Sequence, residues 1–397
     1  MTATVHQPVP APAPAPAGST VVLHPALAPH ERTGRVLSLD ALRGFDMIWI
    51  LGLEEVVHAM AKVWPNGFFE FLAWQMDHKK WEGFGFYDLI FPTFVFMVGA
   101  SIVFSLTRLV ETRGRAGAVR RVVVRGVVLY LLGLLYYGGL SKHLWNIRPM
   151  GVLQRIALAY LFTGLLFIYL KPRALLAVTI ALLVGYWAWL SFVPVPGVGH
   201  ASFAEGENWT NYMDRMYLPG RKWDGDHDPE GILSTFPAVA TCLLGVFAGL
   251  LIRDKTVDPR RKALILFAGG VGAVVVGFLW GLQFPVIKKL WTSTFVLVAG
   301  GYSAILLSVF YLVIDVWGYR RWATPFVWIG VNAITLYLVK EVVDFPVVAE
   351  RLVGGADSAL RLNVWHQYGE LVVYVVAVLL VLLLARFLYK RQIFLRV

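Results

Sequence analysis

The stretch Asp77–Ile102, DHKKWEGFGFYDLIFPTFVFMVGASI, begins with charged and polar residues and continues into about twenty apolar residues. A helix of that length can cross the roughly 30 Å hydrocarbon core of a bilayer. Apolar runs of this kind recur along the chain, which indicates an integral membrane protein. The stretch also raises a chemical question, because His78 and Asp88 stand where the apolar run begins.

The composition of the 397 residues agrees with this interpretation. Hydrophobic residues make up 58% of the chain, above the roughly 45–50% of a typical soluble domain. The net charge of +11 would suit nucleic acid in a soluble protein, but Lys and Arg in a membrane protein collect in cytoplasmic loops. We therefore expect the lipid bilayer as a partner and no nucleic acid. One cysteine, Cys242, permits neither an internal disulfide nor a thiolate metal site, and no metal is expected.

The predicted fold is all-α, a polytopic bundle of about ten transmembrane helices. Only helices or closed barrels satisfy the backbone in lipid, and continuous rather than alternating apolar runs argue against a barrel. We expect residues 1–34 to form a disordered, Pro/Ala-rich cytoplasmic tail and residues 35–397 to form the transmembrane domain. The expected spans are 39–60, 86–107, 120–140, 151–170, 173–193, 231–252, 262–284, 291–316, 322–343 and 368–389.

The distribution of basic residues predicts the orientation of these spans. One set of loops carries most of the Lys and Arg residues, so both termini are predicted to be cytoplasmic. The opposite loops are longer and rich in Trp, Asn, Asp and Gly, a composition that suits either sugar contacts or an aromatic belt at the membrane surface. All histidines beyond the tail fall on this predicted outer side: His58, His78, His143, His200, His227 and His366.

Several polar residues fall inside the predicted spans, where they are costly and often functional. Asp40 and Arg43 share one helix face and can neutralise each other. Further polar positions include Asp46, Glu54, Glu55, His58, Gln154, Arg155, Asn332, Lys340 and Glu341. Packing through buried ion pairs and interhelical amide bonds is the alternative explanation. Arg155 is the more suggestive of function, because its guanidinium offers a fixed fork of donors to carboxylate or phosphate.

His78 and Asp88 could form a catalytic pair. If the intervening residues fold back as a turn, helped by Gly83 and Gly85, the Asp88 carboxylate reaches the imidazole. A carboxylate on one ring nitrogen fixes the tautomer and leaves the other nitrogen as a base near neutral pH. Spacing alone does not distinguish this pair from a solvated loop histidine.

A family resemblance adds to this interpretation. RVLSLDALRGFDMIWI (Arg35–Ile50) and HKKWEGFGFYDLIFPTFVFMVGASI resemble blocks of heparan-alpha-glucosaminide N-acetyltransferase and its bacterial relatives. GVLQRIALAY, HDPEGILSTF, LGVFAG and GVNAITLYLVKE match the family in the same order, and the resemblance covers about Arg35 to Glu341.

The resemblance implies a transmembrane acyltransferase domain in a multi-pass protein of a bacterial inner membrane. Acetyl-CoA from the cytosol would be the donor, and the amino group of a glucosamine-type sugar on the far side would be the acceptor. His78 matches the family's catalytic histidine and Asp88 its acidic partner. Members are often dimers, so a homodimer is expected. The predicted cofactor-binding residues are Arg43, Arg155, Gln154 and Asn332.

Two departures from the family pattern lie on the predicted outer side. Glu54 stands where the family often has Asn, and Lys340 stands where the animal enzyme has a histidine. These changes put the identity of the acceptor sugar in doubt more than the chemistry. The predicted substrate-binding residues are Glu54, Lys340, Asp228 and Glu230.

Three other functions remain open. An O-acetyltransferase of a surface polysaccharide would keep the chemistry and change the acceptor. A sugar or solute transporter would also have about ten helices with charges inside the membrane, and transporters often contain Gly/Pro-broken helices. A scaffold without chemistry is the third alternative.

Overall fold

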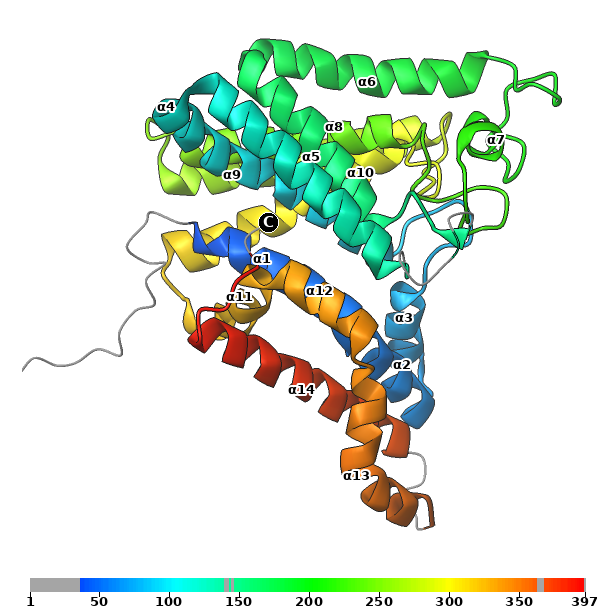
Figure 1. The fold of residues 1–397 in the computed structure, drawn as a ribbon, viewed down its shortest axis with the longest axis vertical. Coiled ribbons are helices and arrows are strands. Elements are labelled where there is room, and N and C mark those ends of the chain that lie inside the picture. The colour runs from blue at the N-terminus through cyan, green and yellow to red at the C-terminus, as the bar shows by residue number, and fades with distance from the viewer. Residues whose placement is uncertain (1–35, 139–142, 144–145, 363–367, 396–397) are drawn as a thin grey trace, which may run out of the picture. The chain divides into compact units, whose positions relative to one another are not determined.

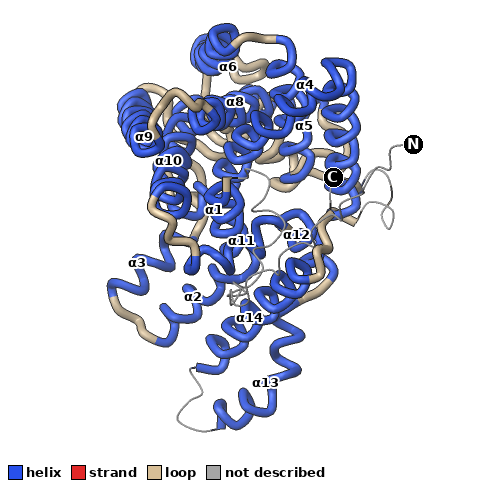
Figure 2. The backbone as a smooth tube through the Cα atoms, turned by 90° about the vertical axis from the view of Figure 1, so that its left-hand side faces the viewer, coloured by secondary structure: helices blue, strands red, loops and turns tan. Residues whose placement is uncertain are grey.

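The computed structural model describes residues 36–138, 143, 146–362 and 368–395. The predicted tail 1–34 and His366 lie outside these residues. The described part consists of helices joined by loops, and its extended pairing is limited to two isolated bridges (Figure 2). The all-α prediction is therefore confirmed. In chain order the elements are α1 (Leu37–Ile48), η2 (Trp49–Leu53), α2 (Glu54–Val63), α3 (Gly67–Met76), α4 (Phe86–Tyr136), α5 (Val152–Tyr169), α6 (Pro172–Phe192), α7 (Trp209–Tyr217), α8 (Thr235–Arg253), α9 (Pro259–Gly281), α10 (Ser293–Phe310), η5 (Tyr311–Val316), η6 (Arg321–Ala323), α11 (Thr324–Val331), α12 (Ala333–Val342), α13 (Phe345–Leu362) and α14 (Gly369–Lys390).

Seven helices of the described chain are long and apolar enough to cross a membrane, or eight if the bent pair α11–α12 counts as one span. They confirm a polytopic membrane protein, but the predicted number of about ten is not confirmed. The predicted span 86–107 and residues 120–136 of the predicted span 120–140 fall within α4, whose 51 residues are interrupted at Gly114. A straight helix of that length would measure about 77 Å at 1.5 Å per residue, more than twice the thickness of the hydrocarbon core.

The predicted span 39–60 differs most from the structure. It is divided into α1, the π-helical turn η2 and α2, and the break is at Gly52. Gly52 has a φ of 129°, a conformation that glycine adopts readily because it has no Cβ. This break turns Glu54, at the start of α2, away from the regular continuation of α1.

Helices pack most closely where glycines face each other. A Cβ on Gly99 of α4 would lie 1.8 Å from the carbonyl oxygen of Cys242, and a Cβ on Gly245 of α8 would lie 1.8 Å from that of Phe96. The two backbones therefore touch, as membrane helices do at small residues. α5 packs against α4 on this side, and α9 packs against α10 (Figure 1). α10 also packs against α4 and α8, and the loops that precede α4 and α10 are in contact.

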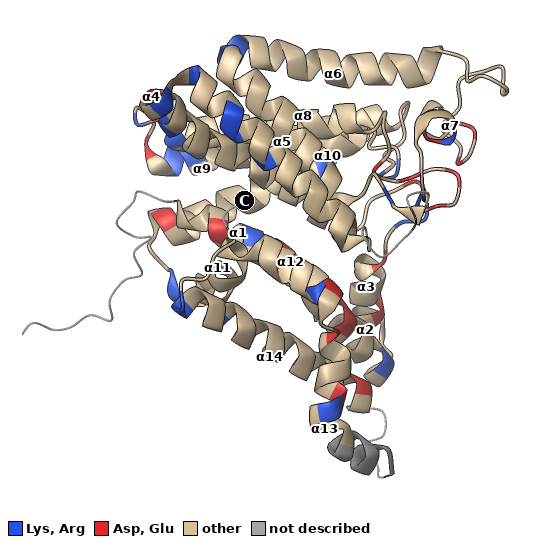
Figure 3. Ribbon diagram, in the orientation of Figure 1, with Lys and Arg blue, Asp and Glu red and all other residues tan. Residues whose placement is uncertain are grey.

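Charged residues lie in several regions of the fold. Lys and Arg gather around the bend of α4 and the start of α9, and the loops beside α7 carry both signs (Figure 3). Acidic and basic residues also lie on α1, α2, α12 and α13. The candidate site is built from the loops that precede α4, α8 and α10.

Candidate active site

His78 and Asp88 are paired. The imidazole Nδ1 lies 2.9 Å from Oδ1 of Asp88, and the Asp88 side chain is completely buried whereas 54% of the His78 side chain is exposed. A carboxylate only accepts hydrogen bonds, so the proton of this contact is on Nδ1. The other ring nitrogen, Nε2, is then the one that can take up a proton. The geometry matches the orientation expected of a histidine base held by a carboxylate.

The start of α4 explains why Asp88 points at His78. Gly85 is the N-cap residue, and its backbone N–H donates to Asp88 Oδ2 over 3.1 Å. The backbone N–H of Lys79 donates to the same oxygen over 3.4 Å. One carboxylate oxygen therefore caps the helix and fixes the preceding loop, while the other contacts His78. Gly83, with a φ of 115°, provides the turn between them.

Lys288 completes this group, and the sequence did not single it out. Its Nζ lies 3.3 Å from Asp88 Oδ1 and 3.0 Å from His78 Nδ1. The side chain is 19% exposed, and burial lowers the pKa of Lys288 while the neighbouring Asp88 carboxylate opposes this effect. The only signal in the sequence was a pair of lysines in the otherwise apolar segment FPVIKKLW.

An unusual backbone contact brings Lys288 to His78. Glu82 and Ile287 form an isolated antiparallel bridge, and the N–H of Gly83 donates to the carbonyl of Val286 over 2.9 Å. The loop before α4 and the loop before α10 are thereby joined. Residues about 200 positions apart in the chain meet because two short loops pair.

Two predicted substrate-binding residues lie on the other side of His78. The ring of Tyr87 lies 4.8 Å from the imidazole, centroid to centroid. Tyr87 in turn hydrogen-bonds to Glu54, which also interacts electrostatically with Lys340. Lys340 donates to the carbonyl of Ile50, next to the break at Gly52. Glu54 and Lys340 are thus connected to His78 through Tyr87.

The other two predicted substrate-binding residues are held by an arginine. Arg148 makes paired hydrogen bonds of 2.7 and 2.6 Å to Asp228 and one of 2.5 Å to Glu230. Its guanidinium lies against the rings of Tyr137 and Trp223, at 4.7 and 4.9 Å from their centroids. A buried arginine with two carboxylates is a strong charge-assisted arrangement. Arg148 was not among the predicted site residues, because it lies in a loop and not in a predicted span.

Arg155 and Gln154 contact two different loops from α5. Arg155 donates to the carbonyls of Pro229 and Gly231 and to the hydroxyl of Ser234. Gln154 donates to the carbonyl of Arg148 over 3.3 Å. Both side chains are fully buried and bind protein groups. Arg155 therefore holds the segment that carries Asp228 and Glu230, and Gln154 contacts the loop of their partner Arg148.

The remaining predicted cofactor-binding residues lie elsewhere. Arg43 hydrogen-bonds to Asp40 over 3.1 Å and to the hydroxyl of Ser101. Asn332 is buried at the 65° bend between α11 and α12 and donates to the carbonyl of Trp328 over 3.4 Å. The structure does not bring Arg43 or Asn332 into hydrogen-bonding contact with the His78 group among the described residues.

A separate cavity of about 370 Å³ lies beside the bend of α4. Its size is within the range of small-molecule sites. Arg125 stacks on the ring of Tyr160 at 4.9 Å, and its Nε is buried without a hydrogen-bond partner in the described part of the chain. The lining residues are Ser105, Leu106, Arg108, Leu109, Thr112, Arg113, Arg121, Arg125 and Tyr160. The cavity is therefore strongly positive and suits an anionic group.

Comparison with known proteins shows the family of the chain. Residues 35–278 match the family described as heparan-alpha-glucosaminide N-acetyltransferase, catalytic. The chain belongs to this family. The human heparan-alpha-glucosaminide N-acetyltransferase is 29% identical over 391 residues, and the mouse protein of the same name is 27% identical over 386. Each alignment covers 81% of this chain and 56% of the relative, so the chain spans about half the length of the curated relatives it matches.

Family membership confirms the resemblance that the sequence blocks indicated. His78, Asp88 and Arg148 all lie within the matched range, as do Asp228 and Glu230. Lys288, Asn332 and Lys340 lie beyond residue 278. The group around His78 therefore combines residues from the matched range with a lysine from outside it.

Proposed function

We propose that this protein is a membrane acetyltransferase that moves the acetyl group of acetyl-CoA to the amino group of a glucosamine-type sugar. The observation that carries this proposal is the 2.9 Å contact between His78 Nδ1 and the buried Asp88. Family membership supports the reaction type. The proposed chemistry requires a base held in a defined tautomer, and this contact holds His78 in one.

The proposed reaction begins at His78 Nε2. This nitrogen takes the proton of the acceptor amine as the amine nitrogen attacks the thioester carbonyl carbon. The carbon–sulfur bond then breaks, and the CoA thiolate recovers a proton from the imidazolium. Asp88 stabilises the imidazolium, and the Lys288 ammonium beside it offers positive charge to the developing oxyanion. An alternative scheme, in which His78 is itself acetylated first, remains open and would give ping-pong kinetics.

The arginine-lined cavity at the bend of α4 is the proposed site for the phosphates of CoA. Four arginines line it, and arginine suits phosphate because its donors match the oxygens in pairs. Ser105, on its wall, follows Asp88 by 17 residues, which is about 25 Å along the helix at 1.5 Å per residue. The donor would then extend along α4 toward His78. The roles of Arg43, Arg155, Gln154 and Asn332 in cofactor binding stay predictions.

Thiol release from acetyl-CoA tests the catalytic proposal. We expect His78→Ala to reduce glucosamine-dependent release by about 10²–10⁴-fold, the usual contribution of general base catalysis. His200→Ala, in another predicted outer loop, is the matched control and should keep full activity. Both variants should bind CoA and melt like the wild type. Full activity in His78→Ala would rule out the mechanism.

A second set of variants tests the donor site. Arg125→Gln should raise the KM for acetyl-CoA with little change in kcat, because it removes binding that is equal in the ground and transition states. Arg260→Gln, exposed at the start of α9, is the control. An unchanged KM in Arg125→Gln would exclude this cavity as the phosphate site.

Transport without acyl transfer is the second candidate, and one observation favours it. The bend of 65° at Asn332 resembles the broken helices at the binding sites of transporters. Asn332 Oδ1 is buried without a hydrogen-bond partner among the described residues. Sugar counterflow in liposomes lacking acetyl-CoA would support transport, and its absence together with thiol release would exclude it.

A further inference from the structure

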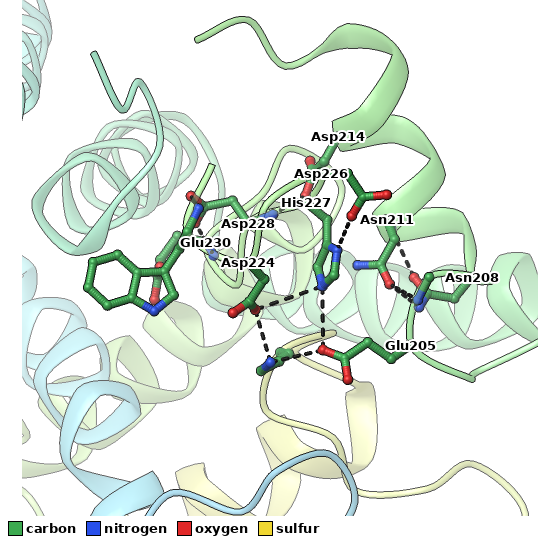
Figure 4. Close-up of polar contacts among 12 residues, drawn as sticks. Glu205, Asn208, Asn211, Asp214, Asp224, Asp226, His227, Asp228 and Glu230 are labelled. Carbon is green, nitrogen blue, oxygen red and sulfur yellow. Dashed lines mark hydrogen bonds and ion pairs between the residues drawn. The ribbon is translucent and has the colours of Figure 1, made fainter. Parts of the chain in front are cut away.

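A second cluster of side chains lies apart from His78, in the loops beside α7. Glu205 precedes α7, and Asp224 and His227 follow it (Figure 4). The ligand-type atoms of these three residues all lie within 4.8 Å of one another. His227 Nε2 is 3.6 Å from Glu205 Oε1 and 3.8 Å from Asp224 Oδ2. These separations are too long for hydrogen bonds.

His227 is oriented toward the two carboxylates by a third. Its Nδ1 lies 2.7 Å from Asp226 Oδ1, so Nδ1 carries the proton of that contact and Nε2 faces Glu205 and Asp224. His227 is only 5% exposed, and Nε2 is buried with no hydrogen-bond partner in the part of the chain that the structure describes. A buried acceptor nitrogen left unpaired is costly, which points to a missing ligand.

We propose that Glu205, Asp224 and His227 bind a divalent transition-metal cation of the zinc type. Zinc takes imidazole nitrogen and carboxylate oxygen at roughly 2.0–2.2 Å, so ligands on one ion lie about 3.3–3.6 Å apart in tetrahedral geometry. The two separations from His227 Nε2, 3.6 and 3.8 Å, are close to that spacing. Asp226 supplies the carboxylate that commonly orients a metal-binding histidine. Sequence analysis expected no metal because it considered thiolate ligands, and these three ligands come together only in the fold.

Lys289 forms ion pairs with both carboxylates. Its Nζ lies 2.9 Å from Glu205 Oε1 and 3.0 Å from Asp224 Oδ2. The side chain is 26% exposed, so the ammonium can turn toward solvent when a cation takes its place. Lys289 therefore competes with the metal. Replacing Lys289 therefore distinguishes a cation site from an ion-pair cluster that Lys289 itself completes.

The site would fasten one loop to another. Glu205 lies in the segment after α6, whereas Asp224 and His227 come directly before Asp228, the partner of Arg148. A cation bound by all three would tie these segments together. It would thereby restrict the motion of the loop that carries Asp228. This loop is far from His78 in the sequence.

Zinc titration of the full-length chain in detergent, after removal of metals with EDTA, tests the proposal. The wild type should bind one zinc ion per chain, measured by calorimetry and by metal analysis. His227→Gln should weaken binding at least about tenfold, and Glu205→Gln is the second variant should His227→Gln fail to fold. His200→Gln, an exposed histidine of the same loop region, should leave binding unchanged. Lys289→Met should tighten binding, because it removes the competing ammonium.

Three results would overturn the proposal. They are no stoichiometric zinc binding by the wild type, unchanged binding in the folded His227→Gln variant, and weaker binding in Lys289→Met. Melting temperatures in EDTA establish that each variant is folded. Because the readout is metal binding and not acetyl transfer, its failure would leave the proposed function untouched.

Discussion

Asp88 shows how one buried residue can have two tasks. Its Oδ2 accepts backbone hydrogen bonds at the start of α4, and its Oδ1 contacts His78 and Lys288. A buried carboxylate is costly unless it is paired in this way. Helix capping and histidine orientation are therefore coupled, so a change at Asp88 would disturb the helix start as well as the proposed base.

Lys288 offers a cleaner test of the group's chemistry, because it caps no helix. Its Nζ lies 3.0–3.5 Å from the imidazole nitrogens of His78, so its charge is close to the position where the proposed oxyanion would form. We expect Lys288→Met to lower kcat about 10²–10³-fold, the usual loss when one oxyanion donor is removed. Lys288→Arg should retain more activity than Lys288→Met, because it keeps the positive charge. An unchanged kcat in the folded Lys288→Met variant would exclude this role.

Asp214 of α7 predicts a pH dependence of stability. Burial raises its pKa from 3.8 to about 6, although the N–H groups of Ile232 and Asp228 donate to it. Between pH ~4 and ~6 the folded state binds a proton that the unfolded state does not. The contribution of Asp214 to the free energy of unfolding is therefore largest below this window and is lost as the pH rises through it. The loss is about 3 kcal/mol, since one pKa unit corresponds to about 1.4 kcal/mol. Asp214→Asn should flatten this part of the melting profile between pH 4 and 7, whereas Glu207→Gln should not.

At the scale of helices, glycines decide how α4 and α8 cross. Gly99→Ala would place a methyl group 1.8 Å from the Cys242 carbonyl, so the helices would have to separate. We expect a loss of about 3 kcal/mol or more, since overpacking of a tight contact has few ways to relax. Gly185→Ala in α6 is the matched control, because a Cβ there meets nothing within 4 Å. Equal melting temperatures in detergent for the two variants would contradict this account of the packing.

The predicted elements differed from the structure where the backbone departs from a regular helix. The break at Gly114 lies between the predicted spans 86–107 and 120–140. The break at Gly52 divides the predicted span 39–60, since hydropathy records apolar character and not local φ. The bend at Asn332 divides the predicted span 322–343 for the same reason. Apolar length therefore located the helices but not their breaks.

At the scale of the whole molecule, charge predicts the orientation in the membrane. Arginines gather around Gly114 at the bend of α4, and the His78 group lies in loops at the other end of this part of α4. We predict that Arg113→Cys reacts with an impermeant thiol reagent only from the cytoplasmic side and Glu207→Cys only from the opposite side. Labelling of intact and inverted vesicles measures this. Cys242 is the single native cysteine and is buried, so it should contribute no signal. Reversed labelling would refute the orientation.

The sequence by itself predicted the fold class and the family, because these depend on apolar length and on ordered motifs. It suggested the His78–Asp88 pair through the family resemblance, and the structure places the two side chains in contact. Their pairing needed only a local turn and a helix cap. The tertiary structure alone decided the place of Lys288 beside His78, of Arg148 between Asp228 and Glu230, and of Glu205 near His227. These contacts join loops distant in the chain, and loop pairing is set by how the helices pack, for which a linear pattern of apolar residues carries no signal.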